Sequence, residues 1–394
     1  MHRLKILHVV PTYMPAWRYG GTIQSVHGLC RSLARLGHQV HVFTTNVDGP
    51  NNSDVPLEKP VDIDGVKVWY FPSRYFRRLY WAPAMKKALK NRIKDFDLLH
   101  MHSVFLWPTW MAARIAEKER VPYIVSPRGM LVGHLIKRRN RFIKTLWIRC
   151  IEQHTLKRAA GIHVTTDLEA KEASHTGLEL APMYVVPNGI DLYGAAGEDA
   201  RSVSPAVAAL IQRSPLILFI SRISWKKGLD RLIMALPYVP EAHLVIVGND
   251  EEGYRPFLEK ITKTQGVSDR VLFAGPLYGP DKYALLTRAA VFALPSYSEN
   301  FGLAVLEAMA AGCPVVVTPE VGLADIVRET SSGLVTEGNP AVLGKALKEL
   351  VKDDVLRRKM GQNGVATVRN RFLWDSIALK MQDEYMRILH RARR

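Results

Sequence analysis

Short apolar runs alternate with longer segments in which apolar residues recur every three to four positions, from one end of the chain to the other. The short runs predict β-strands, and the periodic segments, such as 23–36 and 109–119, predict amphipathic helices. Strands are expected in the first half at residues 4–10, 39–44, 66–70, 98–101, 123–126, 162–165 and 184–186. In the second half they are expected at residues 216–221, 243–247, 271–274, 291–294 and 314–317. Such alternation indicates parallel sheets with helices on both faces.

The predicted elements fall into two groups, each large enough for a domain. A chain of 394 residues exceeds what one hydrophobic core usually organises. Gly, Ala, Ser and Pro gather between residues 187 and 214, which indicates the junction. We therefore expect an α/β protein of two facing Rossmann-like, doubly wound domains, residues 1–190 and 191–373, with a last helix 374–391 able to pack back on the first. Ligands of such folds bind at the carboxyl ends of the strands, here in an interdomain cleft.

Positive charge is concentrated in the first half of the chain. The net charge is +17, and residues 1–190 hold 28 Lys and Arg against 14 Asp and Glu, whereas the remainder holds 26 against 23. Such a field attracts nucleic acid, anionic lipid or phosphorylated substrates. Cys30, Cys150 and Cys313 are too few and too far apart for a disulfide framework or a zinc site. Without an apolar run of about 20 residues or a signal-peptide cleavage site, a cytoplasmic protein is expected.

The most informative segment is residues 292–307, where a strand ends at Pro295 and a helix begins near Gly302. A helix start exposes free backbone N–H groups and the positive end of the helix dipole, which attract an anion. Glu299 precedes this helix and Glu307 lies within it, so the two carboxylates could accept hydrogen bonds from different hydroxyls of one ligand. The alternative is that Glu299 caps the helix and Glu307 is a solvated charge. The apolar helix body disfavours that alternative, because a carboxylate there is costly without a partner.

Two cations follow the first strand of the second half. Arg222 comes at the end of that strand, and Lys227 comes directly before the next predicted helix. Both are expected to converge on phosphates at the helix start near Gly302, where they would stabilise a departing nucleoside diphosphate without a metal. The alternative is a basic surface turn, which would be the better interpretation of a single lysine.

Two histidines end the strand predicted at residues 98–101. His102 is expected to point into the cleft, where its imidazole could donate to a sugar hydroxyl or exchange a proton. His100 lies two residues earlier on the same side of the strand and is interpreted as packing. The alternative for His102 is a structural histidine whose hydrogen bonds are satisfied within the protein.

The two Asp-x-Asp sequences, residues 62–64 and 95–97, do not indicate a metal site. Asp64-Gly65 is a hairpin-turn signal, and the second sequence leads directly into a strand. Neither is expected beside other oxygen ligands, so no essential Mg²⁺ or Mn²⁺ is predicted.

The segment from Glu299 to Glu307 resembles the Glu-x7-Glu motif of the retaining glycosyltransferases of family 4, which have the two-domain GT-B fold. Arg222 and the pair Lys227-Gly228 match the diphosphate-binding arginine and lysine of that family. The likeness covers nearly the whole chain, because further matches follow in the expected order at residues 19–22 (YGGT), 99–103 (LHMHS), 126–130 (SPRGM), 186–191 (VPNGID) and Gly248.

The resemblance implies transfer of a sugar from a nucleoside-diphosphate sugar to an acceptor, with retention of configuration and without a metal or other cofactor. The catalytic residues would be His102 at the reacting carbon, Glu299 on the donor sugar, and Arg222 and Lys227 on the leaving diphosphate. The donor site would comprise Gly20, Gly21, Arg222, Lys227, Leu277, Glu299, Asn300, Phe301, Gly302, Leu303 and Glu307. The acceptor would be bound by Tyr13, Arg128 and His134.

Two basic segments in the first half of the chain could bind an anionic partner. Cations gather on one face of the amphipathic helix expected at residues 136–149, and residues 74–81 mix cations with aromatic side chains. These patches could rest on an anionic membrane and present a lipid-linked acceptor. The alternative is a core-facing helix with a solvated basic face. No base-stacking motif, zinc knuckle or helix-turn-helix pattern is present, so nucleic acid is not an expected partner.

The sequence therefore predicts a cytoplasmic glycosyltransferase, peripheral on the inner face of the membrane if the basic patches bind lipid, that builds a surface polysaccharide or a lipid-linked glycan. Two other functions stay open. One is a nucleotide-sugar epimerase or phosphorylase of the same fold, and the other is a non-catalytic two-domain ligand-binding protein. A dinucleotide-dependent dehydrogenase is disfavoured, because residues 11–21 lack Gly-x-Gly-x-x-Gly.

Overall fold

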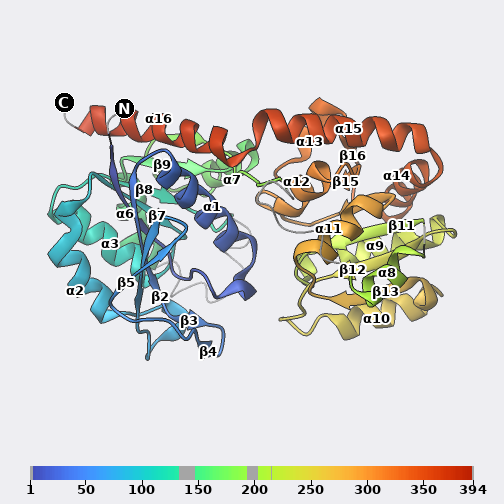
Figure 1. Cartoon of the computed structure of the whole chain (residues 1–394), viewed down its shortest axis with the longest axis horizontal. Coiled ribbons are helices and arrows are strands. Elements are labelled where there is room, and N and C mark those ends of the chain that lie inside the picture. The colour runs from blue at the N-terminus through green and yellow to red at the C-terminus, as the bar shows by residue number, and fades with distance from the viewer. Residues whose placement is uncertain (1–2, 133–146, 193–202, 214, 393–394) are drawn as a thin grey trace. The chain divides into compact units, whose positions relative to one another are not determined.

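Two compact units make up the protein in the computed structural model (Figure 1), which describes residues 3–132, 147–192, 203–213 and 215–392. Unit 1 comprises Met1–Gly189 together with Trp374–Arg394, and unit 2 comprises Ile190–Leu373. Each unit contains its own parallel sheet. The prediction of an α/β fold with two doubly wound domains is confirmed, while the cleft expected between them stays a prediction.

The sheet of unit 1 has eight strands in the order β10-β9-β8-β7-β1-β2-β6-β5. All neighbours pair in parallel except β5 and β6, which form an antiparallel hairpin at one edge. Asp64 and Gly65 turn this hairpin with φ values of 53° and 80°, so the predicted turn is confirmed. The strands are β1 (Lys5–Val9), β2 (Gln39–Thr45), β5 (Pro60–Ile63), β6 (Val66–Phe71), β7 (Leu98–His102), β8 (Tyr123–Ser126), β9 (Gly161–Val164) and β10 (Met183–Val185).

Helices cover both faces of this sheet. Alternate strand residues face opposite ways. Ile6 packs in one core with α1 and α16, and Leu7 in the other with α2 and α3. The helices are α1 (Gly21–Arg35), α2 (Pro83–Arg92), α3 (Trp107–Lys118), α6 (Gln153–Arg158), α7 (Asp167–Ser174) and α16 (Trp374–Ala392), and a small hairpin joins β3 (Val47–Asp48) to β4 (Asn51–Asn52).

The last helix, α16, packs against α1 within unit 1 (Figure 1). The indole of Trp374, at the start of α16, is 6% exposed. It fills the space beside two glycines: a Cβ atom would lie 2.2 Å from the indole at Gly28 and 2.6 Å from it at Gly189. The absence of side chains at these two positions is therefore what allows the helix to approach so closely.

We expect Gly28→Ala to destabilise the protein, although alanine favours helices. The new methyl group would collide with Trp374, and overpacking of this kind costs about 1–3 kcal/mol. Urea unfolding should therefore give a lower midpoint for Gly28→Ala than for the wild type. Thr22→Ala, at an exposed position of the same helix, should leave the midpoint unchanged. A Gly28→Ala protein as stable as the wild type would show that α16 does not pack at this site.

The sheet of unit 2 has six parallel strands in the order β13-β12-β11-β14-β15-β16. Its central strands are continuous apolar runs that are buried on both faces, as a parallel sheet between two helical layers requires. The strands are β11 (Leu216–Ile220), β12 (His243–Val247), β13 (Val271–Gly275), β14 (Val291–Leu294), β15 (Val315–Val317) and β16 (Gly333–Val335). The helices are α8 (Pro205–Ile211), α9 (Leu229–Ala235), α10 (Arg255–Thr264), α11 (Gly279–Arg288), α12 (Leu303–Ala310), α13 (Ala324–Thr330), α14 (Pro340–Lys352) and α15 (Asp354–Arg371).

The structure bears on the absence of a membrane-spanning helix and on the basic helix expected near residue 140. Within the described ranges, no helix combines the length and the apolar character needed to cross a bilayer. The basic helix expected at residues 136–149 lies outside the described residues apart from its last few positions.

Candidate functional site

The carboxylate loop of unit 2 lies at the carboxyl edge of its sheet, between the end of β14 and the start of α12. Hydrogen bonds to the loop after β15 hold it in place: the Glu299 N–H donates to the Glu320 carbonyl at 3.0 Å, and the Gly322 N–H donates to the Glu299 carbonyl at 2.9 Å. Gly302 caps α12 in the left-handed region, at φ 94°, where a side chain would be strained. The loop therefore presents Glu299 from a fixed backbone.

The lysine segment after β11 is joined to this carboxylate loop through backbone contacts. The Tyr297 N–H donates to the Lys226 carbonyl at 2.7 Å. Gly228, between the 3-10 helix Trp225–Lys227 and α9, has φ 67°, and a Cβ there would lie 1.9 Å from the Pro295 carbonyl oxygen. Only glycine fits such a close approach of two main chains. This explains why Gly228 directly follows the lysine that the sequence singles out.

Lys227 and Glu299 form an ion pair between Nζ and Oε2, with side chains that are 13% and 17% exposed. The structure thus brings together two residues, 72 positions apart, that were predicted to share one site. A second pair lies nearby in the fold: Lys282 Nζ of α11 is 2.7 Å from Glu307 Oε1 of α12. Both predicted carboxylates are therefore paired with a lysine.

Lys282 was missed by the sequence analysis. A single lysine in the first turn of a helix is common on protein surfaces, and no motif links it to Glu307, 25 residues further on. Its side chain is 21% exposed and that of Glu307 is 19% exposed, so the pair is partly accessible to solvent.

Arg222 follows β11 at the same edge of the sheet and is exposed. It makes no hydrogen bond or ion pair with any residue that the structure describes. Its convergence with Lys227 on a ligand therefore stays a prediction. Gly248, at φ 152°, packs beside it: a Cβ there would lie 1.8 Å from the Ser221 carbonyl oxygen.

The other predicted donor-site residues have mixed surroundings. Phe301 is 4% exposed and packs in the core of unit 2, which leaves its backbone rather than its ring for a ligand. Leu303 is the first residue of α12, Asn300 lies in the preceding loop, and Leu277 follows β13; all three are partly buried. In unit 1, Gly20 and Gly21 form the start of α1, and a Cβ at Gly20 would meet open space.

His102 ends β7 of unit 1 and is fully buried. Arg128 donates to its Nδ1 from Nε and Nη2, at 3.3 and 3.1 Å. Its Nε2 lies 2.9 Å from His8 Nδ1, so with Nδ1 accepting, Nε2–H is the donor. Both ring nitrogens are thus engaged within unit 1, and the role predicted for His102 at a reacting carbon stays a prediction.

Next to His102, buried side chains of β7, β8, β9 and α16 form a series of hydrogen bonds. His100 Nδ1 is 2.7 Å from the Tyr385 hydroxyl of α16, and its Nε2 is 2.7 Å from Ser126 Oγ. Ser126 Oγ is in turn 2.6 Å from His163 Nδ1. His100 is therefore a packed, hydrogen-bonded residue, as expected, but His102 is equally buried. These hydrogen bonds tie α16 to β7, β8 and β9.

These histidines are neutral at physiological pH. Burial first, and the charge of Arg128 second, lower the pKa of His8 to about 3 and the pKa of His163 to about 3. The pKa values of His100 and His102 also lie well below the ordinary value, with burial again the largest cause. A neutral imidazole donates a hydrogen bond from one ring nitrogen and accepts one at the other, and it adds no positive charge.

His8, His100 and His102 have nitrogens within 4.8 Å of one another, a spacing that could hold a metal ion. Their hydrogen bonds argue for a different role, because of these nitrogens only His8 Nε2 lacks a partner among the described residues. The Asp-x-Asp carboxylates are also engaged elsewhere. Asp64, for example, accepts from His27 at 2.8 Å, and Asp97 accepts from the Lys5 N–H at 2.7 Å.

The predicted acceptor residues that the structure describes have different surroundings. Tyr13 is 1% exposed, and its hydroxyl lies 2.8 Å from His27 Nδ1 in the core. Arg128 is partly buried beside His102. His134 lies outside the described residues. An acceptor role for Tyr13 and His134 stays a prediction.

Comparison with known proteins gives matches over most of the chain. Two family descriptions fit it: Glycosyltransferase Family 4 over residues 19–193 and Glycosyl transferases group 1 over residues 203–367. The chain is 34% identical to the D-inositol 3-phosphate glycosyltransferase of Salinispora arenicola, over 96% of this chain and 90% of that protein. It is 27% identical to the phosphatidyl-myo-inositol mannosyltransferase of Mycobacterium leprae, over 93% and 92%. The structure of Anabaena HepE in complex with UDP and glucose is similar in fold, with a TM-score of 0.73, 20% identity and coverage of 97% and 99%.

Proposed function

We propose that this chain, which belongs to the family 4 glycosyltransferases and is a glycosyltransferase with the GT-B fold, moves a sugar from a nucleoside-diphosphate sugar to its acceptor with retention of configuration and without an essential metal ion. The observation that carries the proposal is the Lys227–Glu299 pair at the carboxyl edge of the unit 2 sheet. It sets a fixed cation beside a fixed carboxylate next to a helix start, which suits a phosphorylated sugar.

In the proposed reaction, unit 2 binds the donor. Lys227 and Arg222 attract the diphosphate, Glu307 accepts from ribose hydroxyls, and Glu299 accepts from a hydroxyl of the sugar. The bond between the anomeric carbon and the diphosphate oxygen breaks, and the acceptor oxygen bonds to that carbon from the same face. The acceptor proton passes to a leaving phosphate oxygen. The two cations stabilise the negative charge that develops on the diphosphate.

In the proposed reaction Lys227 exchanges its partner when the donor binds. In the structure Lys227 pairs with Glu299 and Lys282 pairs with Glu307. A diphosphate would draw Lys227 away from Glu299 and free that carboxylate for the sugar. Each ion pair thus keeps the charges of the site compensated until the ligand replaces one partner.

The donor can be identified with a panel of UDP-, GDP- and ADP-sugars, by thermal stabilisation and by slow donor hydrolysis in EDTA. We expect one base to be preferred, and UDP is the first candidate because HepE was solved with it. Acceptors to be tested with that donor are D-inositol 3-phosphate, on which the Salinispora relative is named to act, and phosphatidyl-myo-inositol, for which the Mycobacterium relative is named. Stabilisation by no nucleotide sugar would contradict the proposal.

We further propose that the protein works in the cytoplasm, on the inner face of the membrane, in the synthesis of a surface polysaccharide or glycolipid. Support comes from an exposed segment of unit 1: Tyr75 and Phe76 are 69% and 72% exposed, and Arg74 and Arg78 are exposed beside them. Aromatic rings and cations side by side suit the interface of an anionic bilayer.

Replacing both exposed rings, Tyr75→Ala and Phe76→Ala, should weaken binding to vesicles that contain phosphatidylglycerol by about tenfold, which equals about 1.4 kcal/mol. Co-sedimentation with vesicles measures this. Tyr278→Ala is the matched control, because Tyr278 of unit 2 is 60% exposed and lies outside the segment. Equal binding by the double variant and the wild type would contradict a membrane role for this surface.

A further inference from the structure

Arg128 is a partly buried cation whose hydrogen-bond partners are all neutral. It follows β8 at the carboxyl edge of the unit 1 sheet. Nε and Nη2 donate to His102 Nδ1, and Nη1 donates to Asn188 Oδ1 at 2.8 Å. Among the residues that the structure describes, no carboxylate lies within 4.0 Å of the guanidinium. A charge in such surroundings costs free energy unless an opposite charge reaches it.

The neighbouring side chains supply one opposite charge, that of Glu169, and no carboxylate of a described residue contacts the guanidinium. The four histidines around Arg128 are neutral, as their lowered pKa values show. The Glu169 carboxylate acts on Arg128 only through its charge, because its oxygens accept hydrogen bonds from other groups. It accepts from the Gly129 N–H at 2.7 Å, from the Thr165 N–H at 2.7 Å and from Thr165 Oγ1 at 2.9 Å.

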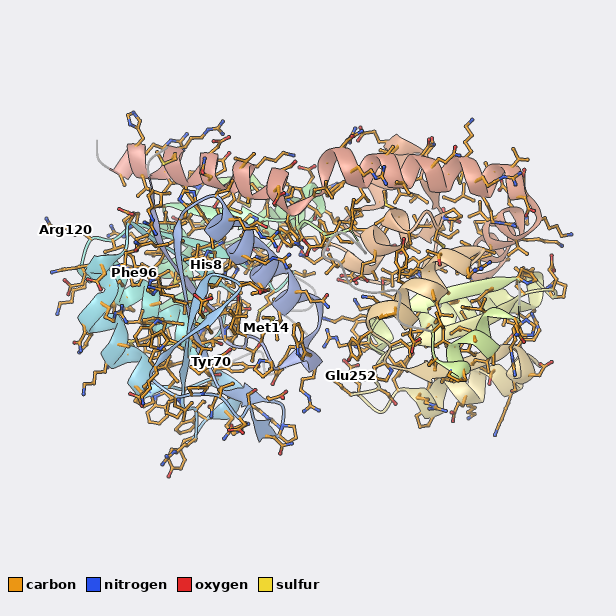
Figure 2. The ribbon with its side chains drawn as sticks, in the orientation of Figure 1. His8, Met14, Tyr70, Phe96, Arg120 and Glu252 are labelled. Atoms are coloured by element: carbon orange, nitrogen blue, oxygen red, sulfur yellow. The ribbon has the colours of Figure 1, made fainter. Side chains whose placement is uncertain are left out.

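Arg128 and His8 both have N–H groups that donate no hydrogen bond to a described residue. The guanidinium has five N–H groups, and its contacts with His102 and Asn188 use three of them. The tautomers fixed by Arg128 leave an N–H on His8 Nε2, which is fully buried and has no partner among the described residues. Figure 2 shows His8 inside unit 1. Donors of both residues are thus without acceptors at the carboxyl edge of one sheet.

The backbone at Arg128 is also unusual. Its φ is 55°, in the left-handed region that a non-glycine residue rarely adopts. Strained residues of this kind concentrate at binding sites, where the surrounding structure holds them in place. The strain and the guanidinium without a contacting carboxylate among the described residues both point to a ligand.

We propose that Arg128 binds a phosphate group of the acceptor. This inference rests on the proposed function, in which the acceptor is bound by unit 1. The two remaining N–H groups of Arg128 donate to phosphate oxygens, and the phosphate supplies the negative charge that the histidine cluster lacks. The excess of Lys and Arg over Asp and Glu in residues 1–190, 28 against 14, attracts such an anion to unit 1.

Thermal unfolding of the full-length protein tests this proposal with inorganic phosphate as the probe, replacing chloride at constant ionic strength. Lys227→Gln is introduced first, so that phosphate no longer binds at Lys227. Phosphate should raise the Tm of this protein, and adding Arg128→Gln should remove the rise. Arg120→Gln is the matched control, because Arg120 also has a positive φ, of 59°. Unlike Arg128, it is exposed and lies at the edge of unit 1 (Figure 2).

Stability without phosphate provides a second readout. In chloride alone, Arg128→Gln should raise the Tm by about 2–4 °C, because it removes a partly buried charge that no described carboxylate contacts. Arg120→Gln should leave the Tm unchanged. A phosphate-induced rise in Tm that survives Arg128→Gln would overturn the proposal, and so would a lower Tm for Arg128→Gln in chloride.

A calorimetric titration with UDP separates the two possible sources of phosphate. If Arg128 binds the acceptor, Arg128→Gln should bind UDP within about twofold of the wild-type affinity, a difference well under 1.4 kcal/mol. A loss of tenfold or more would place Arg128 on the donor diphosphate and overturn the acceptor assignment. Failure of the wild type to bind UDP would count against the proposed donor, whereas the phosphate experiment would still decide the role of Arg128.

Discussion

Replacing Lys227 by glutamine should lower kcat by about 10²–10³-fold, the usual cost of removing one group that stabilises developing negative charge. Lys227 is held between two loops by the Gly228 approach to Pro295 and by the Tyr297–Lys226 hydrogen bond. The backbone that carries its ammonium is therefore fixed at the carboxyl edge of the sheet. The measurement is the rate of transfer at saturating donor and acceptor, with circular dichroism to show that the variant is folded.

Lys345→Gln provides the matched control, because Lys345 is exposed on α14. This variant should retain the wild-type rate. If Lys227→Gln transferred sugar at that rate too, Lys227 would not act on the leaving group.

Glu299→Gln should lower kcat as strongly as Lys227→Gln but affect donor binding in the opposite direction. The carboxylate that contacts the sugar is lost, so transfer should fall by about 10²-fold or more. The ion pair with Lys227 is lost as well. Lys227 then meets the diphosphate without a competing carboxylate, so we expect UDP to bind as tightly as it does to the wild type, or more tightly.

The two variants together distinguish the roles of the pair. Isothermal titration with UDP should give a weaker affinity for Lys227→Gln and an equal or stronger affinity for Glu299→Gln. Weaker binding of UDP by Glu299→Gln would mean that the carboxylate organises the phosphate site rather than the sugar. Unimpaired transfer by Glu299→Gln would refute its assignment to the donor sugar.

The regular parts of the fold could be predicted from the sequence, because buried parallel strands are continuous apolar runs. The five strands expected in unit 2 are all present. β16 was missed: it has only three residues, Gly333–Val335, and the glycine breaks its apolar run. β5 was also missed, because it is an edge strand with a mixed pattern that begins at Pro60.

Residues of the candidate site could be predicted only where they belong to a local sequence motif. Lys227 and Glu299 come from loops with recognisable turns and a helix start, and they do form a pair. The pairing of His100 with Tyr385 joins residues 285 positions apart, and nothing local in either segment indicates it. The same holds for Lys282 and Glu307. Such contacts depend on how helices pack over the sheet, which periodicity does not specify.

His102 shows the limit of the strand-end argument. A residue at the carboxyl end of a parallel strand is expected to reach a ligand. Here the neighbouring Arg128 and His8 occupy both nitrogens of the ring, so the side chain closest to solvent in this cluster is the partly buried arginine. The sequence motif places His102 at the end of β7, where the structure has it, but it does not show which side chains of that edge reach solvent.

Unit 2 is proposed to bind a nucleoside diphosphate through Lys227 and Arg222 with no divalent ion. Isothermal titration of the full-length protein in EDTA, with the nucleoside diphosphate of the donor that the panel identifies, tests this proposal, and Lys227→Gln and Arg222→Gln are measured in parallel. We expect the wild type to bind in EDTA and each variant to bind at least about tenfold more weakly, a loss of about 1.4 kcal/mol. Binding that requires Mg²⁺ or Mn²⁺, or equal affinities for all three proteins, would overturn the proposal.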